Sequence, residues 1–231
     1  MTVVEKIGFY SITLAALTLL LGLLGLIYVP QTTDKVGIGT SVLTAISIQF
    51  LVYDRLRDSA LRRLDFLNKK ALSPALKVSK GTVQGTYGSD SVFSKSQEML
   101  QRHGKFLGVK LYPKKLPEML ASGAKLISTF TNTRDRIENA GYKVWGRDRF
   151  NFWAVFVAVG LMPQGNYTDD MVKTHKEFFD SLKKSDNEAW ELFPKLGKEI
   201  SELNEQISKT IEDFFLDNQM EPVKEEPGPF G

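Results

Sequence analysis

The hydrophobic residues of this chain divide it into two parts that meet near residue 53. Ile7 to Val29 is a run of 23 residues without a charge, and Val36 to Tyr53 is a second run of 18. At 1.5 Å per residue the first run exceeds a hydrocarbon core of about 30 Å, and the second lies near the lower limit for crossing it. The short connection, Pro30 to Lys35, forces the two runs to be antiparallel. The pattern predicts an N-terminal transmembrane helical hairpin over residues 1–53, with spans at about 7–29 and 36–53.

A cleaved signal peptide is the alternative interpretation of the first run. Such a peptide has an apolar region of about 7–15 residues and then a cleavage site made of small residues. Here the run is longer and is followed by Tyr28-Val29-Pro30-Gln31. We therefore expect the segment to remain as an anchor.

Each predicted span carries a seam of small residues at helical spacing. Such a seam lets helix backbones approach closely in lipid, where apolar burial gives little drive for association. One interpretation places the two seams against each other within one hairpin, and the other docks one seam on another subunit. The first seam consists of Ser11, Ala15, Thr18, Gly22 and Gly25, and the second of Gly37, Thr40, Thr44 and Ser47.

Basic residues after the second span predict the orientation of the hairpin. The connecting loop offers only Lys35, so the positive-inside rule places both termini in the cytoplasm, at a plasma or inner membrane. Anionic headgroups are then an expected partner of this basic cluster. The basic cluster consists of Arg55, Arg57, Arg62, Arg63, Lys69 and Lys70.

Residues 54–73 are predicted to continue the second span as a basic amphipathic helix that ends at Pro74. Leu56, Ala60, Leu64 and Leu67 recur at helical spacing. This apolar stripe is typical of a helix lying in the headgroup layer, and equally of a helix packed on its own domain.

Residues 74–217 are predicted to form a mainly helical soluble domain, with a short strand at Lys110 to Tyr112 as a small β element. The Gly- and Ser-rich stretch Lys77 to Ser96 lacks the Gly-Lys-Ser/Thr ending of a phosphate-binding loop and is interpreted as a connection. Pro117 favours a helix start, and Gly141 is expected to end that helix. Phe150 to Met162 is too short to span a membrane and indicates a core helix or an interfacial element.

The last third of the domain is predicted to contain capped helices. Asp186 is positioned to cap a short helix that ends before Pro194. The final helix either packs within the domain or forms a coiled coil, and residues 218–231 are expected to be a disordered acidic tail rich in proline. The apolar positions of the final helix are Leu196, Ile200, Leu203, Ile207 and Phe214.

Composition removes several kinds of chemistry from consideration. The chain has no cysteine and only two histidines, which excludes thiol catalysis and Cys-ligated metals, and we expect no cofactor, no metal site and no catalytic residue. Charge is asymmetric: residues 54–152 hold 20 Lys/Arg against 9 Asp/Glu, whereas residues 153–231 hold 8 against 16. No nucleic-acid-binding fold signature accompanies the basic part, so nucleic acid is not an expected partner.

These patterns favour a membrane-anchored interaction or scaffold subunit rather than an enzyme. Its hairpin would hold the helical domain at the inner leaflet, within a larger membrane complex or by self-association. The alternative is an oligomerising two-span membrane effector or pore-forming protein controlled by its cytoplasmic domain.

Overall fold

The computed structural model describes residues 3–28, 32–81, 88–145 and 176–223, and these are mostly helical with one small two-stranded sheet. The chain divides into two compact units. Unit 1 comprises Met1–Ser73, Met99–Lys114 and Glu212–Gly231, and unit 2 comprises Pro74–Glu98 and Lys115–Ile211. In order, the elements are α1 (Val3–Tyr28), α2 (Thr32–Leu67), the π-helix η1 (Asn68–Leu72), α3 (Ser73–Ser79), α4 (Ser89–His103), β1 (Lys105–Phe106), β2 (Val109–Lys110), α5 (Leu116–Trp145), α8 (Lys176–Ser185) and α9 (Asn187–Asp217).

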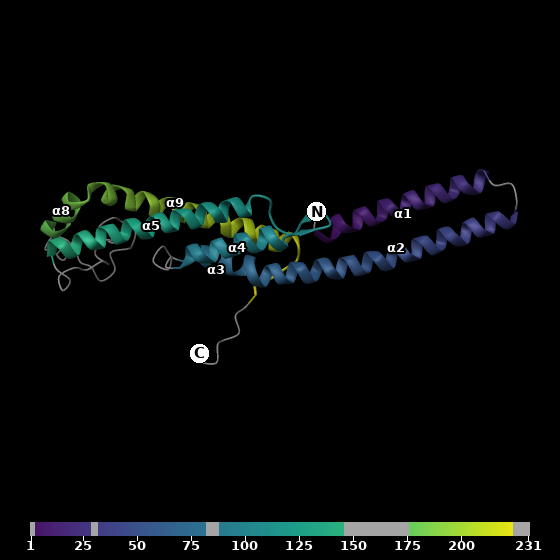
Figure 1. Cartoon of the computed structure of the whole chain (residues 1–231), viewed down its shortest axis with the longest axis horizontal. Helices are drawn as coiled ribbons and strands as arrows, with labels where there is room; N and C mark the ends of the chain where they lie inside the picture. Colours follow the sequence, from purple (N-terminus) through teal and green to yellow (C-terminus); the bar gives the residue numbers. More distant parts are fainter. Residues whose placement is uncertain (1–2, 29–31, 82–87, 146–175, 224–231) are drawn as a thin grey trace, which may run out of the picture. The chain divides into compact units, whose positions relative to one another are not determined.

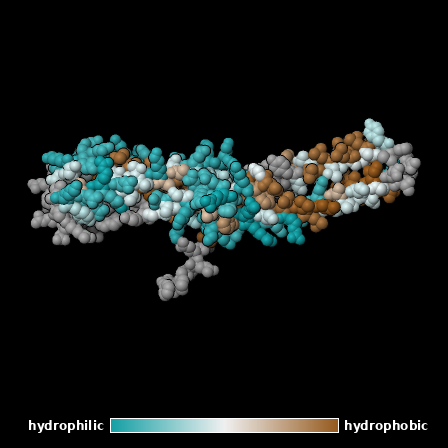
Figure 2. All heavy atoms as spheres, viewed as in Figure 1, coloured by the Kyte–Doolittle hydropathy of each residue, from teal (hydrophilic) through white to brown (hydrophobic). Residues whose placement is uncertain are grey.

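Helices α1 and α2 of unit 1 lie side by side and antiparallel (Figure 1). Within the described residues, α1 and the helical run from Lys35 to Ser79 are long and apolar enough to cross a membrane. Only 6% of the most apolar window of α1 is buried, and 0% of the corresponding window of the second run is buried. Figure 2 accordingly shows apolar residues on the surface of this pair. A core helix of a soluble protein would be covered, so the exposure agrees with two candidate membrane helices.

The predicted amphipathic extension is the C-terminal part of α2. Its apolar residues Ala60, Leu64 and Leu67 are 1%, 4% and 0% exposed. The stripe is therefore covered by protein, which excludes the interpretation that lays it in the headgroup layer. The basic residues beside it stay on the surface.

Pro74 does not end the helical run. The backbone forms the five-residue π-helix η1 after α2 and then continues as α3, which contains Pro74. Asn68 opens η1 and is 6% exposed. Its amide nitrogen donates to the Glu221 carbonyl at 2.8 Å, and its oxygen accepts from the Ser73 hydroxyl at 2.6 Å. The Val223 N–H in turn donates to Ser73 Oγ at 2.9 Å. Thus 218–223, which the sequence assigns to the tail, is held against η1, whereas 224–231 lies outside the described residues.

A tight β-hairpin follows α4 in unit 1. Strands β1 and β2 are antiparallel, with Lys105 opposite Lys110 and Phe106 opposite Val109. The strand expected at Lys110 to Tyr112 thus begins one residue earlier and pairs with a strand that the sequence pattern did not reveal.

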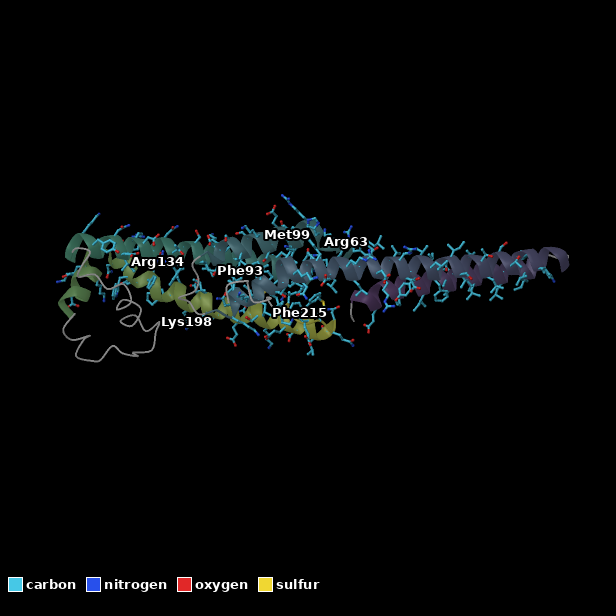
Figure 3. The ribbon with its side chains drawn as sticks, turned by 90° about the horizontal axis from the view of Figure 1, so that it is seen from below. Arg63, Phe93, Met99, Arg134, Lys198 and Phe215 are labelled. Carbon is cyan, nitrogen blue, oxygen red and sulfur yellow. The ribbon has the colours of Figure 1, made fainter. Side chains whose placement is uncertain are left out.

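Unit 2 is a helical bundle whose core holds large aromatic side chains. Phe130 of α5 stacks on Phe193 of α9 with ring centroids 4.5 Å apart, and Phe93 of α4 is fully buried (Figure 3). A Cβ at Gly123 would lie 2.8 Å from the Phe93 ring, so this glycine makes room for the phenylalanine.

Two expected helix breaks are absent from unit 2. Helix α5 continues through Gly141 to Trp145, and α9 continues through Pro194. An interior proline costs about 3 kcal/mol. However, Phe193 and Leu196 on either side of Pro194 are buried, and burying such side chains contributes roughly 1.5–3 kcal/mol each. Asp186 does cap α9, because its Oδ1 accepts the Ala189 N–H at 3.1 Å.

The buried face of α9 within unit 2 does not follow a heptad. Its residues are spaced 3-4-4-3-4, closer to the period of a straight helix than to that of a coiled coil. Leu203 and Phe214 of the predicted set are half-buried. Because Leu196, Ile200 and Ile207 are already covered, they are not available for a coiled coil with another chain. From Phe193 onward, the buried set within unit 2 is Phe193, Leu196, Ile200, Asn204, Ile207 and Ile211.

Replacing Asn68 tests the contact between η1 and the C-terminal segment. We expect Asn68→Ala to lower the free energy of unfolding by about 1–3 kcal/mol, because buried polar groups lose their partners. Asn187→Ala is the matched control, since that exposed amide makes one bond, to Glu191, and should change stability by less than about 0.5 kcal/mol. Urea unfolding followed by circular dichroism measures both, and equal effects would contradict the assigned role of Asn68.

Candidate functional site

The first seam of small residues forms the face of α1 that packs on α2. Gly22 is buried, and a Cβ there would overlap the side chain of Val42. At the two ends of the contact, Gly25 faces Ile38, and a Cβ at Gly8 would lie 3.3 Å from the Tyr53 hydroxyl oxygen. Small residues thus set the distance between the two helices, as close packing in lipid requires.

A polar pair lies in the middle of this interface. Gln49 Nε2 donates to Thr18 Oγ1 at 2.7 Å, and the Thr18 hydroxyl donates to the Leu14 carbonyl at 3.0 Å. Gln49 Oε1 is buried and has no hydrogen-bond partner among the described residues. In hydrocarbon an unsatisfied oxygen is costly, and the bond to Thr18 fixes the register of the helices.

The second seam does not pack on the first. Gly37, Thr40, Thr44 and Ser47 are all exposed, whereas α2 turns Ile38, Val42, Ala45 and Gln49 toward α1. The interpretation in which both seams meet inside one hairpin is therefore wrong. The reason is steric: α1 supplies the small side of the contact, and α2 fills it with branched side chains.

The hydroxyl groups of the exposed seam are satisfied by their own helix. Thr40 donates to the Val36 and Gly37 carbonyls at 3.1 and 3.0 Å, Thr44 to Thr40 at 2.8 Å and Ser47 to Leu43 at 2.9 Å. Since these donors do not need water, the seam can lie in a dry environment.

A shallow groove of about 660 Å³ runs between α1 and α2 beside the second seam. Half of its lining residues are glycine, serine or alanine, namely Gly22, Gly37, Ser41 and Ala45, and the others are Thr18, Leu21, Ile38 and Val42. We call the second seam and this groove together the seam groove. It is a surface on which another helix backbone could approach closely.

All six residues of the basic cluster are exposed, so their charges are available to a ligand or surface. Two of them have specific contacts. Lys69 pairs with Asp65 at 2.8 Å, and Arg63 donates to the Lys105 carbonyl at 3.2 Å while its guanidinium carbon lies 5.3 Å from the Phe106 ring centroid. Arg63 therefore ties α2 to the β-hairpin.

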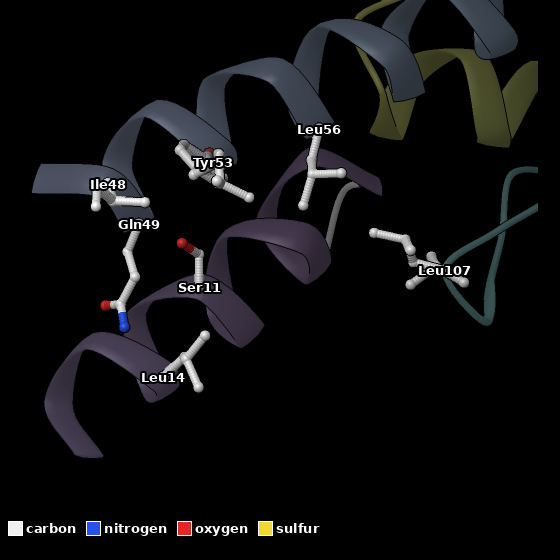
Figure 4. A pocket seen from close by; sticks show the side chains of 9 residues that line it. Ser11, Leu14, Ile48, Gln49, Tyr53, Leu56 and Leu107 are labelled. Atoms are coloured by element: carbon white, nitrogen blue, oxygen red, sulfur yellow. The ribbon is translucent and has the colours of Figure 1, made fainter. Parts of the chain in front are cut away.

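A second cavity, of about 360 Å³, lies at the end of the helix pair nearest the β-hairpin (Figure 4). Sequence reasoning missed it, because its wall combines α1, α2 and a hairpin distant in sequence. The one signal for it in the sequence was an apolar residue, Leu107, directly before the turn-forming Gly108. The wall consists of Ser11, Leu14, Ile48, Gln49, Val52, Tyr53, Leu56, Leu107 and Val109.

Unit 2 carries an ionic cluster centred on Arg136. Arg136 donates to both carboxylate oxygens of Asp186, at 3.0 and 2.9 Å, and to Glu188 at 3.1 Å. These hydrogen bonds raise the pKa of Arg136, so it keeps its charge at every pH of interest. Because Asp186 also caps α9, the cluster joins α5 to the start of α9.

Comparison with protein-family models, curated proteins and solved structures finds no match to this chain.

A double-mutant cycle tests the polar pair. Thr18→Val should destabilise the helix pair by about 0.6–2 kcal/mol, because the Gln49 amide then lacks its acceptor. Thr18→Val combined with Gln49→Leu should regain most of that loss, since no buried amide remains. Unfolding of the full chain in mixed micelles measures the coupling, and purely additive effects would show that the bond contributes nothing.

Proposed function

We propose that this protein is a membrane-anchored scaffold subunit that docks on another transmembrane helix through the seam groove. The partner is a second copy or another subunit of a membrane complex. The observation that carries the proposal is the exposed seam of α2, whose hydroxyl donors are already satisfied. The helical domain is thereby held at the inner leaflet, with both termini in the cytoplasm.

Support for membrane anchoring comes from the surface of α1 and α2. Large apolar side chains such as Leu21, Leu43 and Leu51 are 66–67% exposed. An apolar surface of this extent is unfavourable in water and suits lipid. The basic cluster at the domain end of α2 supports the orientation.

The groove is matched to a helix in its chemistry. In lipid, helix association depends on van der Waals contact at short backbone distance, for which glycine, serine and alanine leave room. A partner seated here would cover Gly37 and Ser41 in the groove and Thr40 and Thr44 beside it.

The alternative of a pore-forming effector receives less support from the same residues. A water-filled pore requires polar groups free to face water. Here the hydroxyl hydrogens of Thr40, Thr44 and Ser47 are directed to carbonyl groups of their own helix. Packing of another helix on the seam without water leaves these hydrogen bonds in place.

Bulky substitution in the seam tests the proposal. We expect Thr40→Leu with Thr44→Leu to weaken association at least about tenfold, because the added side chains hold a partner helix away. Native mass spectrometry of gently extracted protein and energy transfer between labelled copies in vesicles measure association with other subunits and with itself.

Thr13→Leu is the matched control for this substitution. Thr13 is an exposed threonine of α1 with the same bond to the preceding turn, at 2.7 Å to the Phe9 carbonyl. It should leave association unchanged. A wild-type protein that is a lone monomer in both measurements contradicts the proposal, and leakage of vesicles on oligomerisation favours the pore alternative.

A further inference from the structure

The π-helix η1 brings together two side chains that an α-helix would keep apart. Asn68 and Ser73 are five residues apart, and in an α-helix such positions point in directions about 140° apart around the axis. Here the Ser73 N–H donates to the Asn68 carbonyl, and the Ser73 hydroxyl donates to Asn68 Oδ1 at 2.6 Å. Bonds across five residues are those of a π-helix, a rare form that often marks a functional position in a helix. This pair therefore exists only while η1 keeps its π geometry.

The end of the chain binds both members of this pair. Asn68 Nδ2 donates to the Glu221 carbonyl at 2.8 Å, and the Val223 N–H donates to Ser73 Oγ at 2.9 Å. Pro222 lies between the two bonded groups, where it fixes its own φ and favours an extended conformation at Glu221. The result is one chain of hydrogen bonds that runs from Val223 through Ser73 and Asn68 to Glu221, with all four residues in unit 1.

These bonds hold the segment without burying it. We call Glu221, Pro222 and Val223 together the C-terminal strap, and all three side chains are exposed. The strap is thus held through its backbone, and its release removes no buried side chain of its own from the protein interior. Hydrogen bonds that water can replace contribute little net stability, so such a contact can open and close.

The chain enters the strap through a strained residue at the end of α9. The Met220 N–H donates to the Phe215 carbonyl at 2.8 Å, and the Gln219 N–H donates to the Leu216 carbonyl at 3.2 Å. This pattern commonly has glycine at the position of Gln219, because the backbone there is left-handed. Gln219 has φ of +53°, a conformation that is unfavourable for a residue with a side chain. Release of the strap lets Gln219 leave this conformation, so strain offsets part of the gain from the bonds to the strap.

We propose that the C-terminal strap is a releasable clamp that keeps the π-turn of η1 closed. With the strap bound, Asn68 is 6% exposed and both ends of its amide are paired. With the strap released, the amide and Ser73 Oγ turn to water, and the bonds across five residues open. This conformational device goes beyond the proposed function and does not depend on membrane anchoring.

The place of η1 in the chain gives the clamp its consequence. The π-helix begins directly after α2 ends at Leu67, and the chain then continues as α3. Because bonds across five residues place more residues in a turn than bonds across four, opening the π-turn changes the rotation with which the chain leaves α2. Coupling of this kind is reciprocal. An event that engages the end of the chain therefore acts on the exit from α2, and a change at that exit acts on the end of the chain.

Val223→Pro tests the clamp in the full chain, because proline removes the N–H that donates to Ser73 and leaves Asn68 and Ser73 in place. Val223→Ala is the matched control, since it removes an exposed side chain and keeps the N–H. Hydrogen exchange measured by mass spectrometry follows residues 68–73, with α5 as the reference. We expect Val223→Pro to speed exchange over 68–73 at least about tenfold and Val223→Ala to leave it unchanged.

The reference helix separates a clamp from a general contribution to stability. Faster exchange over 68–73 in Val223→Pro, with unchanged exchange in α5, supports the proposal. Unchanged exchange over 68–73 overturns it, and so does an equal acceleration in α5. Acceleration of the same size in Val223→Ala also overturns it, because the side chain and not the backbone bond would then hold the strap.

A second experiment tests the reciprocal effect with a spin label, which the absence of cysteine allows to be placed at one position. Glu221→Cys carries the label on the exposed side chain of the strap and keeps the carbonyl that accepts from Asn68. We expect the label to become more mobile in electron paramagnetic resonance spectra when Asn68→Ala or Ser73→Ala is added. Ser59→Ala, at an exposed serine of α2, is the control and should leave mobility unchanged. Unchanged mobility in both test variants, or an equal increase in Ser59→Ala, overturns the proposal.

Discussion

The close approach of α1 to α2 is the constraint on which the helix pair of unit 1 depends. Gly22 leaves no room for a side chain beside Val42, and a Cβ at Gly8 would lie 3.3 Å from the Tyr53 hydroxyl oxygen. Because α1 presents its small residues inward, α2 must present its larger ones, and the small residues of α2 are turned outward. The exposed seam of small residues on α2 therefore arises from the way in which the pair itself packs.

The single amide in this interface adds specificity to the packing. The contact of Gly22 with Val42 already limits how the two helices can slide, and a hydrogen bond between side chains adds a directional constraint. The bond from Gln49 to Thr18 is satisfied in one register only. The same register places Leu56 near the hairpin and Leu14 beside Gln49 at the far end of the cavity, so that both line its wall (Figure 4).

Helix content and the small β element could be predicted from the sequence, because long apolar runs and capping residues such as Asp186 act locally. The direction in which the second seam points could not be predicted. Gly37, Thr40, Thr44 and Ser47 have the same spacing in the sequence whether they point toward α1 or away from it. The continuation of α9 through Pro194 depends on burial of Phe193 and Leu196, which a local rule about proline does not include. Membrane insertion and the orientation of the hairpin stay predictions. The segment Phe150 to Met162 lies outside the described residues.

The seam groove and the cavity at the hairpin differ in the size of their lining residues and in their position along the helix pair. The seam groove begins at Gly37 and ends near Ala45 and Ser47, toward the loop between α1 and α2. The cavity begins at Ile48 and extends to Leu56 and Leu107, toward the hairpin. Small residues such as Gly37 and Ser41 leave room in the groove for another backbone, whereas the larger side chains of Val52, Leu56 and Leu107 form the wall of the cavity. The difference follows from the packing of the pair, because the part of α2 that carries small residues ends before the cavity begins.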